Sequence, residues 1–128
     1  MKLLLDTCTF LWMIDSVEPL SPVAREKLED GGNELVLHQA SAWEIQLKHQ
    51  AGKLHLKKDP AGMIREGLRK HEVAYQTLRD AEIWHLAKLP DHHRDPFDRI
   101  LISAALCHGM KLVTPDSRIQ SYPVPVIW

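Results

Sequence analysis

The sequence predicts an α/β fold in which helices cover a central, mostly parallel β-sheet. The first observation is that short apolar runs alternate with longer segments of helical periodicity, which is the pattern of consecutive βα units. The second is that the first run, Leu3–Leu5, is apolar at every position, as expected for a strand buried on both faces. In such sheets, ligands bind beyond the carboxyl ends of the strands.

Five short segments are expected to form the strands. The last of them follows Pro123 and contains Pro125, and proline cannot donate a hydrogen bond to a neighbouring strand. We therefore expect this strand at an edge of the sheet. In chain order, the expected strands are 3–5, 34–38, 73–75, 111–114 and 124–127.

Helix start and stop signals divide the rest of the chain. Three helices are expected to begin at a proline that follows Ser or Asp, because proline is favoured at the first helical position. Glycines just past the expected ends of three helices supply the usual stop signal. The expected helices are a short one containing Phe10, Leu11 and Ile14, a second from Pro22 to the glycines at 31 and 32, and the segments 41–51, 60–70, 79–88 and 96–108.

Size and composition indicate an ordinary globular protein. The chain has 128 residues, 45% hydrophobic and 26% charged, so we expect one domain spanning residues 1–128. No apolar run is long enough to span a bilayer or to serve as a signal peptide, and the two cysteines show no CxxC spacing. We therefore expect a cytoplasmic protein without membrane association. The formal net charge of −1 means that a polyanion would need local basic patches or bound cations.

Five acidic residues stand where expected strands give way to helices or turns, and each has a structural explanation. Asp6 and Asp95 are natural helix N-caps, and Asp98 then complements the helix dipole. Glu44 follows Ser41 at the spacing of a capping box, in which the glutamate bonds back to the backbone of the cap. The last acid lies in a turn, where aspartate is favoured without any chemistry. The set is Asp6, Glu44, Asp95, Asp98 and Asp116.

Together these acids indicate a site for a divalent cation. Parallel strands would bring them to one edge of the sheet, where clustered carboxylates repel one another unless a cation lies among them or some are protonated. A cap also uses only one carboxylate oxygen and leaves the other free. All-oxygen ligand sets suit Mg²⁺ or Mn²⁺ better than zinc or copper. The chemistry indicated is metal-assisted hydrolysis of a phosphodiester.

Four segments of the chain resemble the motifs of PIN-domain ribonucleases, and most closely those of the VapC-like toxins of type II toxin–antitoxin pairs. The resemblance runs from end to end and includes the closing stretch 122–128. It implies an α/β/α sandwich and a Mg²⁺- or Mn²⁺-dependent endoribonuclease. It also implies an RNA substrate, inhibition by a cognate antitoxin, and a homodimer. The four segments are 3–7, 41–45, 93–99 and 112–116.

The resemblance also assigns residues to roles. Asp98 matches the family's third acid better than Asp95, because the segment 100–105 matches the helix behind that acid. Asp95 would then cap the helix or reach the metal through water. The four acids implied to be both metal ligands and catalytic residues are Asp6, Glu44, Asp98 and Asp116. The residues that could contact substrate are Thr7, Thr114 and Arg99. Thr114 matches a small hydroxyl residue before the fourth acid, and for Arg99 pairing with an acid is the favoured interpretation.

Other residues carry weaker expectations. His92 and His93 lie close to the acids and could contact phosphate, but a solvated loop is the favoured interpretation. Lys48 begins a modest basic stretch that could follow an RNA backbone. The four tryptophans are expected in the core or at edges, with one or two lining a groove for an antitoxin helix.

Two other function classes compete with the nuclease. A haloacid-dehalogenase-like phosphatase needs a second Asp two residues after the first, but that position is Cys8. A response-regulator receiver needs a Lys after the last strand, which the sequence lacks. The remaining alternative is a non-catalytic module that binds metal or RNA.

Overall fold

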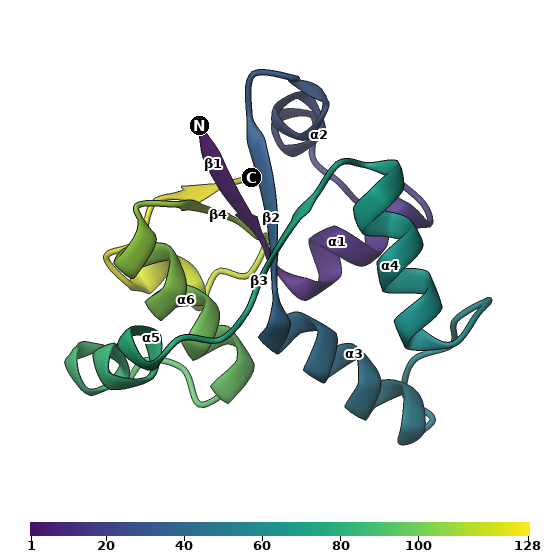
Figure 1. Cartoon of the computed structure of the whole chain (residues 1–128). Coiled ribbons are helices and arrows are strands. Elements are labelled where there is room, and N and C mark those ends of the chain that lie inside the picture. Colours follow the sequence, from purple (N-terminus) through teal and green to yellow (C-terminus); the bar gives the residue numbers. More distant parts are fainter.

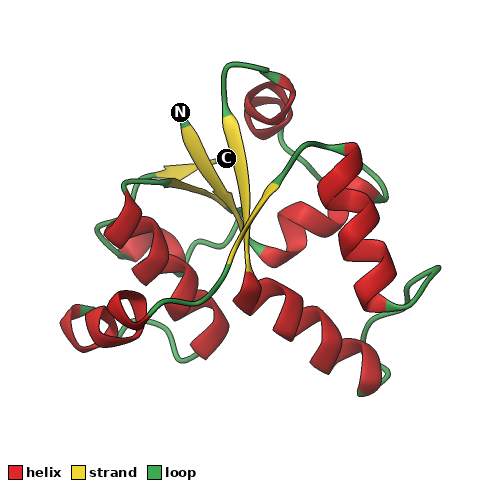
Figure 2. Cartoon of the chain, viewed as in Figure 1, coloured by secondary structure: helices red, strands yellow, loops and turns green.

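The computed structural model describes all residues from Met1 to Trp128. It consists of a five-stranded sheet between two groups of helices (Figures 1 and 2). Short 3₁₀ turns at Leu86–Lys88 and Ile119–Ser121 complete the chain. The elements are β1 (Lys2–Leu5), α1 (Thr7–Ile14), α2 (Pro22–Glu29), β2 (Glu34–His38), α3 (Gln39–Gln50), α4 (Pro60–Lys70), β3 (Ala74–Gln76), α5 (Asp80–His85), α6 (Pro96–His108), β4 (Lys111–Val113) and β5 (Val126–Ile127).

All neighbouring strands are parallel, in the order β3-β2-β1-β4-β5. The central strand β1 pairs with β2 through Leu4 and Val36 and with β4 through Leu4 and Leu112. The expected sheet is therefore confirmed, and β5 lies at an edge as its prolines predicted. Because every strand points the same way, the residues that follow β1, β2 and β4 emerge at the same end of the sheet.

The alternation of side chains along β1 divides the core into two layers. Leu3 and Leu5 are fully buried against Phe10 of α1 and Ile45 of α3. Leu4 points to the opposite face and packs with residues of α6 and the C-terminal segment. Figure 1 shows α1, α3 and α4 on one side of the sheet and α5 and α6 on the other. This arrangement is the predicted α/β/α sandwich.

Several element boundaries differ from the prediction. The helix expected from residue 41 begins at Gln39, because the imidazole Nδ1 of His38 accepts a hydrogen bond from the Ala40 backbone N–H at 2.9 Å and caps the helix earlier. The helix expected over 79–88 stops at His85 and continues as a 3₁₀ turn. The last strand is limited to 126–127, since the prolines before it interrupt pairing. No helix is both long enough and apolar enough to cross a bilayer.

Candidate functional site

The five acids predicted to cluster lie around the carboxyl ends of the central strands. Asp6 follows β1 directly and caps α1 by accepting a hydrogen bond from the Thr9 backbone N–H at 2.8 Å. The Cys8 thiol donates to the same oxygen, Oδ1, at 3.2 Å. The other oxygen, Oδ2, has no hydrogen-bond partner in the chain, although the side chain is almost fully buried. Asp6 is therefore a cap that keeps one carboxylate oxygen for another ligand.

Glu44 does not form the capping box that its spacing from Ser41 suggested. The helix begins at Gln39, so Ser41 lies inside it and no cap is available for the glutamate. Instead, the Thr7 hydroxyl donates to Oε1 of Glu44 at 2.6 Å, and the Lys48 ammonium donates to Oε2 at 2.6 Å. The structural explanation for Glu44 was wrong, and its buried carboxylate is held toward α1 by a residue next to Asp6.

Asp98 lies in the first turn of α6 and is held by His93. The two side chains are joined by a 2.7 Å contact between His93 Nε2 and Asp98 Oδ2. Asp116, in the turn after β4, approaches the same imidazole nitrogen at 3.8 Å. One potential ligand atom from each of these three residues lies within 4.8 Å of the others. The predicted convergence of Asp98 and Asp116 is therefore found, with a histidine between them.

The position of His93 differs from the prediction of a solvated loop. Its side chain is 5% exposed, and its backbone N–H donates to the Tyr122 hydroxyl at 2.9 Å. Tyr122 accepts a second hydrogen bond, at 3.2 Å, from the backbone of His92, which itself stays exposed. The only local signal for this role was the place of His93 five residues before Asp98. The tyrosine that fixes the loop is far along the chain and could not be paired with it from sequence alone.

Asp95 behaves as its sequence context predicted. Its Oδ1 caps α6 by accepting from the backbone N–H groups of Phe97 at 2.9 Å and Asp98 at 3.4 Å. Its second oxygen makes no hydrogen bond within the chain. The cap fixes the first turn of α6 and thereby aims Asp98 toward the other acids. A direct role for Asp95 as a metal ligand stays a prediction.

Asp116 is held by its own loop. Its backbone N–H donates to the Thr114 hydroxyl at 3.1 Å, and its two carboxylate oxygens accept from the Arg118 guanidinium at 3.2 and 3.1 Å. Burial alone would raise the pKa of Asp116, but the hydrogen bonds and charge of Arg118 lower it below its usual value. The Arg118 pair therefore favours the charged carboxylate of Asp116, which is the form that could bind a cation.

The surroundings of Asp98 raise the pKa of its carboxyl group. Burial raises its pKa from 3.8 to about 6, the hydrogen bond from His93 opposes that shift, and repulsion from Asp95 and Glu44 adds to it. The pKa of the Cys8 thiol is also raised, by burial and by the nearby charges of Asp6 and Asp98. The acids from α1, α3 and α6 thus share one electrostatic environment, as a cation site requires.

The three residues expected to contact substrate have structural partners. Thr7 is buried and orients Glu44, and its hydroxyl also lies 3.0 Å from the Ser41 hydroxyl. Thr114 is fully buried beneath the Asp116 turn. Arg99 donates to the Pro90 carbonyl at 2.9 Å and to the Tyr122 hydroxyl at 3.0 Å, and it pairs with no acid. Contact of these three residues with substrate stays a prediction.

The donor set fits a hard divalent cation. Carboxylate oxygens predominate, and Asp6 and Asp95 each keep one oxygen without a partner in the chain. Burial is the main cause of the raised pKa of Asp98, and repulsion from Asp95 and Glu44 adds to it. The residues that could hold such an ion are those with free or ion-paired carboxylates facing the centre of the cluster. They are Asp6, Glu44, Asp98 and Asp116, with Asp95 beside them.

Comparisons with known proteins agree with this fold. The family model described as "PIN domain" matches residues 3–125. No curated protein sequence matches the chain significantly. The structure is similar to that of VapBC2 from Rickettsia felis bound to a promoter DNA fragment, with a TM-score of 0.74 and 15% identity over 98% of this chain and 97% of that one.

Two further complexes share the fold. VapBC-1 from nontypeable Haemophilus influenzae has a TM-score of 0.59 and 18% identity over 98% of this chain and 96% of that one. FitAcB from Neisseria gonorrhoeae has a TM-score of 0.58 and 19% identity over 97% and 95%. Identities this low show a common fold and leave the activity to be argued from the site.

Proposed function

Because the chain belongs to the PIN-domain family, we propose that it is a Mg²⁺- or Mn²⁺-dependent endoribonuclease and the toxin of a type II toxin–antitoxin pair. One observation carries the catalytic part of the proposal. Potential ligand atoms of His93, Asp98 and Asp116 lie within 4.8 Å of one another, at the sheet end where Asp6 and Glu44 also emerge. This end is where ligands bind in parallel α/β sheets.

In this proposal, Asp6, Glu44, Asp98 and Asp116 hold the cation. A bound Mg²⁺ or Mn²⁺ supplies Lewis-acid chemistry, which promotes attack by water and neutralises charge on the phosphate oxygens. The protein's contribution is a fixed set of carboxylates. Asp6 is fixed by its cap on α1, and Asp98 is fixed by Asp95 and His93. Such orientation reduces the rearrangement needed when the ion and substrate bind.

Two cationic side chains complete the proposed site. Lys48 pairs with Glu44 and Arg118 pairs with Asp116, while both chains remain more than half exposed. Their ion pairs balance part of the acidic charge in the absence of other cations. With a cation held by the carboxylates, Lys48 and Arg118 would be free to contact the substrate phosphates, which Lys and Arg side chains commonly bind.

The partner proposals rest on the kind of protein that shares the fold. The similar structures are VapBC and FitAB complexes, which supports our proposal that this chain binds a cognate antitoxin. We also propose a homodimer, which is implied by the resemblance of the sequence motifs to those of VapC-like toxins. The competing function is a non-catalytic module that binds metal or RNA. Asp6 and Asp95 each keep one oxygen that could bind a metal ion, which both functions would use, so RNA cleavage is the observation that separates them.

The test is RNA cleavage by purified protein free of antitoxin. With Mn²⁺, the wild-type protein should shorten RNA, whereas EDTA, Asp6→Asn and Asp98→Asn should each abolish cleavage. Asp59→Asn is the matched control, because Asp59 caps α4 in the way that Asp95 caps α6 but lies outside the acid cluster. If the protein binds RNA but leaves it intact at every metal concentration, the non-catalytic binding module is the correct function. Equal cleavage by both cluster variants would refute the assigned site.

A further inference from the structure

An aromatic pair joins the two helices that carry Glu44 and Asp98. Trp43 of α3 and Phe97 of α6 meet edge to face, with ring centroids 5.1 Å apart and an interplanar angle of 84°. Each aromatic residue directly precedes one of the candidate metal-binding acids in the chain. The pair lies where α3 packs against α6, one helical position from each of these acids.

Trp43 is far more exposed than packing against a neighbour would require. Its side chain is 60% exposed, whereas Phe97 is partly buried. An edge-to-face contact occupies at most one face of the indole, so at least one face of Trp43 is open to solvent. Trp43 is therefore not a core residue, and the expectation that one or two tryptophans line a groove for a partner helix stays a prediction. Phe97 supports a flat aromatic surface that has no partner within the chain.

The charge around the acids limits how RNA can be held there. The acid cluster contains five carboxylates, and the two cations that contact them, Lys48 and Arg118, are both engaged in ion pairs. A phosphate backbone approaching this site is therefore attracted only weakly until a divalent ion is bound. Besides the contacts proposed for Lys48 and Arg118, uncharged contacts would add affinity that does not depend on a bound ion. Stacking of a nucleobase on an aromatic ring provides such a contact and does not depend on the charge of the site.

We propose that Trp43, supported by Phe97, stacks on an unpaired nucleobase next to the scissile phosphate and so positions single-stranded RNA over the acids. This proposal rests on the proposed ribonuclease function and names the form of RNA that the site accepts. The base must be unpaired, because a base inside a duplex has both faces covered by its neighbours. Trp43 is thus a positioning residue, and the acids remain the catalytic ones.

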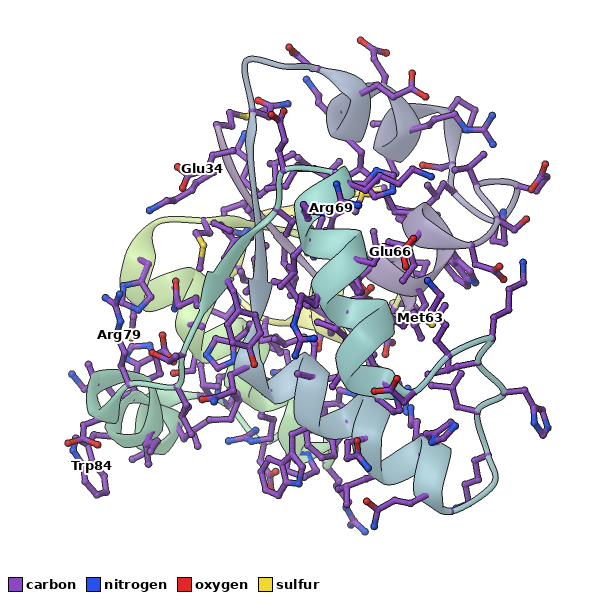
Figure 3. All side chains as sticks on the ribbon, turned by 45° about the vertical axis from the view of Figure 1, so that its right-hand side comes forward. Glu34, Met63, Glu66, Arg69, Arg79 and Trp84 are labelled. Atoms are coloured by element: carbon purple, nitrogen blue, oxygen red, sulfur yellow. The ribbon has the colours of Figure 1, made fainter.

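The test compares three variants in cleavage of a short, unstructured oligoribonucleotide with Mn²⁺. Trp43→Ala should lower kcat/KM by roughly tenfold to a hundredfold, mainly through a higher KM, because it removes one base-stacking contact. Trp43→Phe keeps an aromatic face and should stay within about threefold of wild type. Trp84→Ala is the matched control. Trp84 is 71% exposed, and Figure 3 shows it on α5, directed away from the body of the protein.

A set of oligoribonucleotides with one abasic position each identifies the stacked base. At one position, loss of the base should slow the wild-type protein as much as Trp43→Ala does and should not slow that variant further. If Trp43→Ala cleaves every RNA as wild type does, the stacking proposal is overturned. If the same variant also changes from dimer to monomer, or no longer binds the antitoxin, this face is a protein interface instead.

A binding measurement separates this proposal from the proposed function. If the wild-type protein cleaves no RNA at all, the ribonuclease function fails, and stacking is judged by fluorescence alone. Intact single-stranded RNA should then quench tryptophan emission of the wild-type protein and leave the emission of Trp43→Phe unchanged. Equal quenching in the two proteins would overturn the stacking proposal.

Discussion

His93 is a loop residue on which the arrangement of the candidate site depends. Its imidazole contacts Asp98 and approaches Asp116, and its backbone is anchored by Tyr122. A histidine in this position orients the Asp98 carboxylate and lies near that of Asp116. Partners of this kind, one step removed from a metal, typically change metal affinity or activity by 10–100-fold when they are removed.

We predict that His93→Ala lowers RNA cleavage by about 10–100-fold at limiting Mn²⁺, because Asp98 loses the group that orients it. Raising the Mn²⁺ concentration should recover part of the activity. His92→Ala is the control, since the neighbouring histidine is exposed and contacts none of the acids. Loss of activity that is equal in both variants would show that the loop matters only for folding.

The pKa of Asp98 makes a prediction about stability. Burial is the main reason that this pKa rises from 3.8 to about 6. Between these two pH values, Asp98 therefore keeps its proton in the folded protein and loses it in the unfolded chain. The cost of ionising Asp98 is therefore absent below about pH 4, grows as pH rises, and is fully present above about pH 6. Asp98→Asn cannot ionise and should escape this cost.

Without divalent cations, Asp98→Asn should therefore become more stable than wild type by about 1–3 kcal/mol as the pH is raised from 4 to 7. Urea unfolding at several pH values measures the difference. Added Mn²⁺ should stabilise only the wild-type protein and close the gap, because a ligand stabilises the state that binds it. A difference in unfolding free energy that does not change with pH would contradict the raised pKa of Asp98.

Residue roles could be predicted from sequence only where a local rule applies. Asp6 and Asp95 cap helices as their positions indicated, because capping depends on the next few residues. The capping-box interpretation of Glu44 was wrong, because it relied on a local pattern, whereas the true partner, Thr7, lies 37 residues away. The place of His93 and the packing of Trp43 likewise involve Tyr122 and Phe97, which meet them only in the folded chain.

At the scale of elements, the packing of α4 on α1 depends on the absence of a side chain at Gly67. A Cβ atom there would lie 2.9 Å from Ile14 Cγ2 and 3.0 Å from Phe10 Cζ, closer than ordinary contact. Phe10 is fully buried in the core and has no room to move. Glycine inside a helix is normally unfavourable, so the close approach of the two helices explains its presence.

We predict that Gly67→Ala destabilises the protein by about 1–3 kcal/mol, although alanine favours helices, because the new methyl group overpacks this contact. Chemical denaturation measures the effect. Gly31→Ala is the control, since a Cβ at Gly31 would meet no atom within 4 Å. Greater stability in Gly67→Ala would show that α4 can move away from α1 at little cost.

The order and type of the elements followed from the sequence, whereas several of their ends did not. Strands buried on both faces and proline-initiated helices carry strong local signals, and α2, α4 and α6 begin at the predicted prolines. The start of α3 was missed because a histidine provides the cap, through a ring nitrogen that accepts from the backbone. The break after α5 was missed because residues 86–88 are compatible with either helix type.

At the scale of the whole molecule, a buried polar network joins the sheet to α5 and α6, the helices on the face opposite α1. Glu82 of α5 is fully buried and contacts His38 at 2.7 Å and His108 at 2.7 Å. It also accepts from Gln76 and from the Arg79 backbone. One carboxylate thereby ties α5 to β2, β3 and α6. Burial alone would raise the pKa of Glu82, but the hydrogen bonds from His38, Arg79 and His108 lower it.

We predict that Glu82→Ala costs about 3–5 kcal/mol of stability at pH 7, because it leaves the buried His38 and the partly buried His108 without their partner. Since the folded-state pKa is lowered, the stability from ionised Glu82 is present above the usual value of 4.5 and is lost as pH falls through the folded-state pKa. The cost of the variant, measured by urea unfolding, should therefore shrink in acid. Glu34→Ala, at an exposed position labelled in Figure 3, should have little effect at either pH.

The central claim is that the acids at the end of the sheet cleave RNA, and the most direct measurement is the sequencing of RNA ends after brief induction in cells. Cells producing the wild-type protein should accumulate new ends at discrete positions. Cells producing an equal amount of Asp98→Asn should lack them, because the variant removes one proposed metal ligand and leaves the fold in place. The same new ends in both cultures, or none in either, would contradict the claim.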